Sequence, residues 1–264
     1  MRLETPGMVR GGAPSPTGPE PVASRVQALL GARVVGLSKR FGQVQALDGV
    51  DLDIPSGAVT AVLGKNGAGK TTLIRILATS VVADSGQAWI DGVDLAKDPV
   101  TARCRVGVVL GEDRSFFWRL SGRQNLEFFA ALRGLRRPDA RRAADEALAA
   151  VELSAVADRR VDRYSSGMRS RLGISRALLG APSVLLLDEP TRSLDPAVSH
   201  EIREVLRSLA VERGVAVFLA THDLHEAAAL AAQVVVLEQG KVATRLDGSA
   251  DAGALEDLLV EPRR

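Results

Sequence analysis

The stretch that decides the fold is Val59-Thr-Ala-Val-Leu-Gly-Lys-Asn-Gly-Ala-Gly-Lys-Thr71. Its first five residues are apolar or β-prone, which is typical of a strand buried on both faces in a parallel sheet. Residues 64–71 fit the phosphate-loop pattern, with glycine at both required positions and Lys-Thr at the end. Helical spacing follows over residues 70–79. The sequence therefore predicts a strand, a glycine-rich loop and a helix, in that order.

Each part of this loop suits the phosphates of a nucleotide. Glycines let backbone N–H groups wrap the phosphates, and the start of the helix adds a favourable dipole. Lys70 supplies a charge to the β- and γ-phosphates, while the Thr71 hydroxyl is a ligand for Mg²⁺. We expect the nucleotide to be held by Gly64, Lys65, Asn66, Gly67, Ala68, Gly69, Lys70, Thr71 and Thr72.

Apolar segments elsewhere predict the rest of an α/β core. Buried-strand patterns recur at residues 106–110, 184–187, 215–219 and 234–237, and helical patterns separate the later ones, as in βαβ units. Residues 34–37 and 50–54 look like short strands that belong to an antiparallel part near the N-terminus.

Residues of about 115–180 are mostly helical in pattern and predict a helical subdomain inserted into this core. Ser121 and Gln124 form a capping box at the start of one of its helices. Asp195 and Pro196 predict the start of another helix, with an N-cap and a proline at the first helical position. We expect one ATPase domain over residues 32–264. Residues 1–31, rich in Pro and Gly, predict a disordered tail.

The segment Val184-Leu-Leu-Leu-Asp-Glu189 adds acidic groups to the phosphate loop. A buried strand that ends in Asp188 places a carboxylate where it can hold Mg²⁺, usually through water. Glu189 beside it can polarise an attacking water as a general base. The alternative, an acidic strand end that only caps the next turn, is weak beside a phosphate loop.

Further motifs make the chain resemble the ATPases of ABC transporters. Residues 164–178, which begin with Tyr-Ser-Ser-Gly-Met, resemble the signature motif and its helix, and residues 188–196 look like the Walker B motif running into the D-loop. His222, between Thr and Asp, looks like the switch histidine. Phe41 looks like the aromatic residue that stacks on adenine. The resemblance covers roughly residues 34–241, and its five motifs stand in the family's order.

The resemblance implies a P-loop ATPase whose ATP is sandwiched between two subunits. The phosphate loop of one subunit then faces Ser165, Ser166 and Gly167 of the other, at the start of a helix. Glu189 and His222 are implied as the catalytic residues, with Thr71 and Asp188 at Mg²⁺. We expect a second copy of this chain as one partner, with a heterodimer left open, and transmembrane permease subunits as the others, at the cytoplasmic face of the membrane.

Two departures from the family's pattern bear on its mechanism. The glutamine expected after residues 106–110 is missing, and Gly111-Glu-Asp113 stands there instead. We hypothesise that Glu112 takes over its water- or Mg²⁺-facing role, because carboxylates suit a hard cation. The alternative is that Glu112 and Asp113 both point to solvent.

The residues of the signature motif indicate which subgroup of the family the chain resembles. Tyr164 and Ser166 stand where Leu and Gly are more usual, and Ser193 begins the D-loop. The Ser-Ser-Gly-Met form, together with residues 113–119, looks like exporters of drugs, polysaccharides or lipid-linked glycans. The catalytic acids are intact, so we expect active hydrolysis that energises export.

Composition is that of an ordinary globular protein, with 46% apolar and 25% charged residues. The formal net charge of +2 is nearly neutral, and we expect no nucleic-acid partner. The single cysteine, Cys104, excludes an internal disulfide, and we interpret it as a small core residue. No apolar run approaches the ~18 to 20 residues that span a bilayer, so we expect contact with a membrane only through a partner.

Two other functions stay open from the sequence. One is a soluble ABC-type ATPase in a non-transport role such as iron–sulfur assembly. DNA-repair members carry a long coiled-coil insertion, for which residues 79–165 leave no room, and ribosome-acting members usually hold two cassettes in one chain. The other is a subunit that clamps ATP without turnover, and Glu189 and His222 argue against it.

Overall fold

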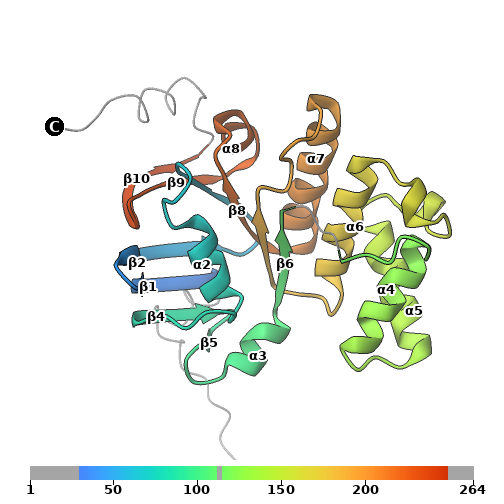
Figure 1. Cartoon of the computed structure of the whole chain (residues 1–264), viewed down its shortest axis with the longest axis horizontal. Helices are drawn as coiled ribbons and strands as arrows, with labels where there is room; N and C mark the ends of the chain where they lie inside the picture. Colours follow the sequence, from blue (N-terminus) through green and yellow to red (C-terminus); the bar gives the residue numbers. More distant parts are fainter. Residues whose placement is uncertain (1–29, 112–114, 249–264) are drawn as a thin grey trace, which may run out of the picture.

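The computed structural model describes residues 30–111 and 115–248. Figure 1 shows these residues as two neighbouring parts, one of sheets with helices packed on them and the other of helices. The predicted tail of residues 1–31 lies almost wholly outside the described residues. The first strand already includes Leu30 and Gly31, so the folded part begins two residues before the predicted boundary.

A six-stranded sheet forms the centre, in the order β10-β9-β3-β8-β7-β6. Its strands are parallel except β10, which pairs antiparallel with β9. Their bounds are β3 (Val59–Leu63), β6 (Val106–Leu110), β7 (Val184–Asp188), β8 (Ala216–Thr221), β9 (Gln233–Glu238) and β10 (Lys241–Asp247). The five buried-strand predictions are therefore confirmed, two of them with the predicted bounds, while β10 was not predicted.

A second, antiparallel sheet lies beside the centre, in the order β2-β1-β4-β5. It contains β1 (Leu30–Phe41), β2 (Val44–Pro55), β4 (Ser85–Ile90) and β5 (Val93–Asp94). The antiparallel part is confirmed, but its first two strands are longer than predicted and form a hairpin. β4 and β5 were not predicted, because only two residues of β4 are buried and its pattern is polar at the start.

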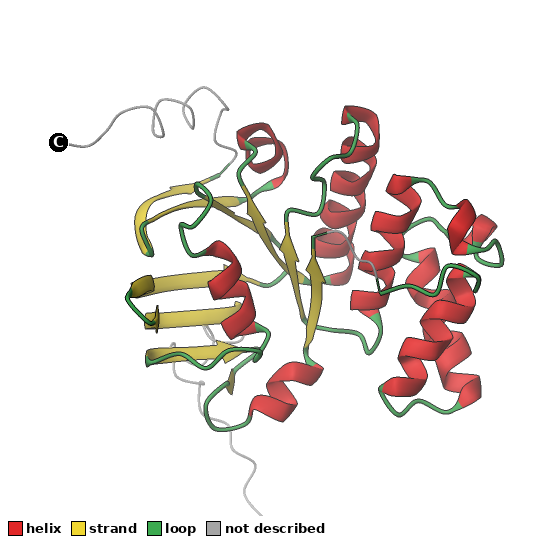
Figure 2. Cartoon of the chain, viewed as in Figure 1, coloured by secondary structure: helices red, strands yellow, loops and turns green. Residues whose placement is uncertain are grey.

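The helices fall into two groups, which Figure 2 shows in red. Helices α2 (Lys70–Leu77), α3 (Pro99–Cys104), α7 (Pro196–Arg213) and α8 (Leu224–Leu230) belong to the α/β part. Helices α4 (Gly122–Leu132), α5 (Arg137–Ala149) and α6 (Ser166–Leu178) make the helical part, with single 3-10 turns at Ser154–Val156 and Val161–Arg163. The mostly helical character predicted for residues 115–180 is confirmed.

Alternation along β7 shows how the central sheet joins the two sides of the molecule. Leu186 packs on the side of α2 and the antiparallel sheet, whereas Leu185 and Leu187 pack toward α7 and the helical part. All three are fully buried. Burying such a side chain stabilises the fold by about 1.5–3 kcal/mol, so apolar layers on both faces hold this strand rigidly.

Parallel register brings the functional loops to one edge of the sheet. Leu63 at the end of β3 pairs with Thr221 of β8, and Asp188 at the end of β7 pairs with Ala220. The phosphate loop, the acidic segment and the switch histidine all follow these strand ends. Because the carboxyl ends of parallel strands meet at one edge, segments more than a hundred residues apart in sequence become neighbours.

The predicted helix starts are confirmed, and one residue prediction is wrong. Asp195 caps α7 by accepting a hydrogen bond of 3.0 Å from the backbone N–H of Val198. Cys104, interpreted as a core residue, is exposed. It is the last residue of α3, a short helix whose buried side is carried by Ala102.

The capping box of α4 gives a test of the helical part. The Ser121 hydroxyl accepts from the Gln124 N–H at 3.1 Å, and the Gln124 side chain accepts from the Ser121 N–H at 2.9 Å. Ser121→Ala should cost about 1 kcal/mol, which lowers the melting temperature by about 2–4 °C in a chain of this size. Ser121→Thr, which keeps the hydroxyl, is the control. Equal melting temperatures for wild type and Ser121→Ala would contradict the cap.

Candidate functional site

The phosphate loop holds its lysine inside the protein. Lys70 is only 6% exposed, and its Nζ donates hydrogen bonds to the backbone oxygens of Gly64 and Lys65. Burial lowers the pKa of Lys70, and the nearby carboxylates of Glu189 and Asp188 partly oppose that shift. The Lys70 ammonium group is thus held by the backbone of the loop. The two nearby carboxylates favour its protonated, charged form.

Two glycines of the loop are required by close packing. A Cβ on Gly64 would lie 2.5 Å from the Leu237 carbonyl oxygen, and one on Gly69 would lie 2.4 Å from that of Ala46. Gly69 also has a φ of 110°, which L side chains rarely adopt. The loop backbone therefore rests directly on β9 and β2. The side chains of Lys65 and Asn66 and the residue Gly67 are exposed, and Ala68 is buried.

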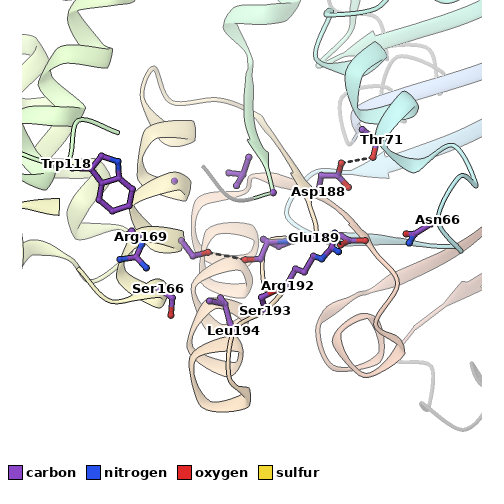
Figure 3. Close-up of a pocket in the computed structure, with 15 residues that line it drawn as sticks. Asn66, Thr71, Trp118, Ser166, Arg169, Asp188, Glu189, Arg192, Ser193 and Leu194 are labelled. Atoms are coloured by element: carbon purple, nitrogen blue, oxygen red, sulfur yellow. Dashed lines mark hydrogen bonds and ion pairs between the residues drawn. The ribbon is translucent and has the colours of Figure 1, made fainter. Parts of the chain in front are cut away.

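A short hydrogen bond joins the loop to the acidic segment. Thr71 Oγ1 lies 2.7 Å from Asp188 Oδ2, so the first turn of α2 and the end of β7 meet (Figure 3). Thr72, next along α2, is partly buried. A hydroxyl and a carboxylate are the hard oxygen ligands that Mg²⁺ takes from proteins, alongside water and substrate phosphates. The residues present therefore fit a Mg²⁺–nucleotide site.

Glu189 and His222 form the second pair of the site. His222 Nδ1 lies 2.9 Å from Glu189 Oε1. The imidazole donates to the Glu189 carboxylate in the tautomer that carries a proton on Nδ1. The Glu189 side chain is 14% exposed and that of His222 57%. The structure thus brings the two predicted catalytic residues into contact, and their catalytic role stays a prediction.

The backbone of Glu189 is strained into place. Its φ is 50°, uncommon for a residue other than glycine, and its N–H donates to the Ala220 oxygen at 2.8 Å. Such a conformation costs on the order of 1–3 kcal/mol and persists only where surrounding structure enforces it. The bond to β8 provides that enforcement and aims the side chain at the edge of the sheet.

Arg192 is a charged neighbour that sequence reasoning missed. Its Nη1 lies 3.2 Å from Glu189 Oε2, outside hydrogen-bond geometry, so this buried oxygen forms an ion pair but accepts no hydrogen bond within the described residues. Arg192 follows Glu189 by three residues. Only the turn after β7 brings the two together, and the sequence carried no signal for that turn.

A cleft of about 880 Å³ opens between the α/β part and the start of α6. Figure 3 shows Asn66 and Ser166 near opposite ends of the labelled side chains, with Asp188, Glu189 and Arg192 between them. The cleft is also lined by Trp118, whose ring has Arg169 Cζ 5.6 Å from its centroid. Sequence reasoning assigned no role to Trp118 or Arg169.

The predicted signature residues begin α6. Ser165 is the N-cap and accepts from the Met168 N–H at 3.2 Å, and both Ser165 and Ser166 are exposed. Gly167 is buried against α7, where a Cβ would lie 2.4 Å from Val198 Cγ1. Exposed N–H groups at a helix start form an anion-binding end. This end is presented outward rather than folded onto the chain's own phosphate loop.

One further predicted residue, Phe41, is not among the residues that line the cleft. Phe41 ends β1 and is 47% exposed, with Lys39 Nζ 5.3 Å from its ring centroid. Its contact with adenine stays a prediction. Glu112 lies outside the described residues, as does Asp113, so its proposed role at Mg²⁺ also stays a prediction.

Comparison with known proteins decides the family. A profile described as ABC transporter matches residues 47–192, more than half of the chain. The chain belongs to the ABC transporter family. It is 44% identical over 209 residues to the daunorubicin resistance ATP-binding protein DrrA2 of Streptomyces coeruleorubidus, a match covering 79% of this chain. That match spans 64% of the relative, so the chain covers less than two thirds of its length.

Solved structures of this family share the fold. The chain superposes on cbiO1 of Clostridium perfringens, part of the ABC transporter complex cbiONQ, with a TM-score of 0.77 and 29% identity, covering 88% of this chain and 91% of that one. It also matches a dimeric ATP-binding cassette in a post-hydrolysis state bound to ADP and Pi, with a TM-score of 0.68 and 26% identity over 82% and 98% of the two chains. The predicted fold class is therefore confirmed.

Lys70 gives the direct test of this ABC cassette's phosphate loop. Lys70→Ala should weaken ATP binding and lower hydrolysis by about 10²-fold or more, because a preorganised positive charge on the phosphates is lost. Binding of a fluorescent ATP analogue and release of phosphate measure the two effects. Lys97→Ala is the matched control, since its side chain is exposed and lies outside the phosphate loop. Equal activity of both variants and wild type would place the site elsewhere.

Proposed function

We propose that this ABC cassette hydrolyses ATP and thereby energises export through separate permease subunits. The observation that carries the proposal is the meeting of Lys70, the Thr71–Asp188 pair and the Glu189–His222 pair at one edge of the central sheet. Together they supply a phosphate charge, a cation site and a base. A cassette that only clamped ATP would not need the last pair.

Each of these residues has a distinct part in hydrolysis. Lys70 holds the phosphate charge, and Thr71 and Asp188 would hold Mg²⁺, which when bound neutralises charge on the phosphate oxygens. Glu189 accepts a proton from the attacking water as its oxygen bonds to the γ-phosphorus, while the bond from that phosphorus to the β,γ-bridging oxygen breaks and ADP leaves. His222 keeps the Glu189 carboxylate oriented through the contact between its Nδ1 and Glu189 Oε1.

A second copy of the chain completes the site in this proposal. The start of α6 is exposed, with Ser165 and Ser166 at its tip and Gly167 packed against α7 behind them. Its free N–H groups suit the γ-phosphate held by a partner's phosphate loop. One solved cassette of similar fold is itself dimeric with ADP and Pi. Two copies facing head to tail would therefore enclose two nucleotides, and hydrolysis would let them part.

An exposed groove lined by apolar side chains and by Arg133 and Arg176 suits the permease. It lies between the edge strand β6 and helices α4 and α6, has a volume of about 310 Å³ and includes Leu132, which is 69% exposed. Beside it, the Phe128 ring centroid lies 5.4 Å from that of the groove residue Phe129 and 4.9 Å from that of Phe117. A contiguous apolar surface marks a binding site for protein. No helix among the described residues has the length and hydropathy to cross a bilayer.

The name of one relative supports a proposal for the class of cargo. DrrA2 carries daunorubicin resistance in its name, and we propose export of an amphiphilic small molecule for this chain as well. The permease would hold the cargo site, with this chain at the cytoplasmic face of the membrane. Reconstitution with the co-purified permease in vesicles, followed by uptake of daunorubicin, measures this directly.

Replacing the base should trap the dimer. Glu189→Gln should keep ATP binding but slow hydrolysis by about 10²- to 10⁴-fold. ATP then persists between the subunits, and size-exclusion chromatography should show a dimer with ATP and a monomer without it. Glu212→Gln, at an exposed position on α7, is the control and should behave as wild type. A Glu189→Gln chain that stays monomeric at high ATP would count against the sandwich.

Charging the groove should release the permease. Leu132→Glu should reduce co-purification of a polytopic membrane protein with the tagged chain about tenfold or more, since a carboxylate would enter an apolar contact. Val211→Glu, which alters a similarly exposed aliphatic residue on α7, is the matched control. Mass spectrometry identifies the partner. Basal ATP hydrolysis should be the same in both variants, and equal recovery of the membrane protein would rule out this groove.

A further inference from the structure

Glu226 is a buried acid to which the mechanism above assigns no role. It lies on α8 and is 1% exposed, and among the described residues Lys70 is the other buried acidic or basic side chain. Its neighbours Ala227 and Leu230 pack into the apolar core. A carboxyl group in such surroundings lowers stability unless hydrogen bonds hold it, so packing alone does not explain its presence.

Thr191 provides such a hydrogen bond. Its Oγ1 donates to Glu226 Oε1 at 2.6 Å, across 35 positions of sequence. Burial raises the pKa of Glu226, and Asp223 raises it further, whereas hydrogen bonds from Thr191 and Thr221 and the positive charge of Arg203 lower it. The hydroxyl groups thus stabilise the carboxylate where water does not reach.

The position of this bond relates it to the catalytic pair. Thr191 follows Glu189 by two residues, and Glu226 follows His222 by four. The loop after β7 and the segment after β8 are therefore joined twice. One bridge is the Glu189–His222 contact, whose histidine is more than half exposed, and the other is the buried Thr191–Glu226 bond.

The segment that carries His222 is itself tied to Glu226. Asp223 caps α8 by accepting from the N–H groups of His225 and Glu226, and its own N–H donates to the Thr221 hydroxyl at 3.1 Å. A shift of Glu226 would move the first turn of α8 and the histidine just before it. A shift of Thr191 would likewise move the strained backbone of Glu189.

We propose that Glu226 is a positioning residue for hydrolysis, whose buried hydrogen bond with Thr191 fixes the distance between Glu189 and His222. The inference rests on the proposed function, since it assigns Glu226 to the same reaction. Glu226 would affect the alignment of the base Glu189, whereas the binding of ATP depends on the phosphate loop.

Substitution of either partner tests the proposal. Glu226→Leu and Thr191→Val should each lower kcat by about 10- to 10²-fold, the loss expected when a catalytic group is displaced by about 1 Å, and should leave the KM for ATP within about twofold. Glu226→Gln and Thr191→Ser, which keep a hydrogen bond, should recover most of the rate. His225→Ala, at an exposed position on the same helix, should match wild type.

A double variant that combines Thr191→Val with His222→Ala distinguishes a role in positioning from a role in stability alone. If Glu226 acts by aligning Glu189 with His222, adding Thr191→Val to His222→Ala should lower kcat by less than about twofold further. If the double variant instead lost kcat by the product of the two single losses, the proposal would be overturned. A normal kcat in Thr191→Val would overturn it as well. Should Glu226→Leu fail to fold, the near-isosteric Thr191→Val still decides the question. A wild-type chain without ATPase activity would instead refute the proposed function.

Discussion

The hydrogen bond between Thr71 and Asp188 is the contact on which the rest of the site depends. It joins the first turn of α2 to the end of β7 at 2.7 Å, and it can form only because β7 and β3 are parallel and flank β8 in one sheet. A sheet with another strand order would leave the phosphate loop and the acidic segment apart. The apolar layers on both faces of the sheet fix this register. The register in turn fixes the position of the phosphate loop relative to the acidic segment.

The site holds groups that lower the stability of the fold. Lys70 and Glu226 are buried charges or potential charges, and Glu189 and Ser193 have φ angles of 50° and 62°. A strained backbone conformation of this kind costs on the order of 1–3 kcal/mol and persists where rigid surroundings enforce it, and a buried charged group lowers stability unless it is paired or hydrogen-bonded. Glu189 and Ser193 line the cleft. Lys70 lies in the adjoining phosphate loop, and Glu226 lies behind the catalytic pair. Their concentration at one edge indicates that the sheet stabilises a geometry which the loops would not adopt alone.

The sequence predicted those elements whose signal lies within a few neighbouring residues. β3 and β6 have the predicted bounds because uninterrupted apolar residues mark strands buried on both faces. β4 was missed because its exposed, polar start becomes a strand only through pairing with β1. The capping box of Ser121 was predictable from residues three apart, whereas the Thr191–Glu226 bond and the Arg192–Glu189 pair depend on tertiary structure. Cys104 was misjudged because residue type alone does not report which side of α3 faces solvent.

Two half-sites, one at the phosphate loop and one at the exposed start of α6, are the central claim of this account. A crystal structure of the Glu189→Gln chain grown with ATP and Mg²⁺ tests it most directly. The account predicts two copies related by a twofold axis, with each γ-phosphate between Lys70 of one copy and Ser165 of the other. Nucleotide bound at Lys70 in a monomer, or in a dimer whose α6 starts face away from it, would contradict the claim.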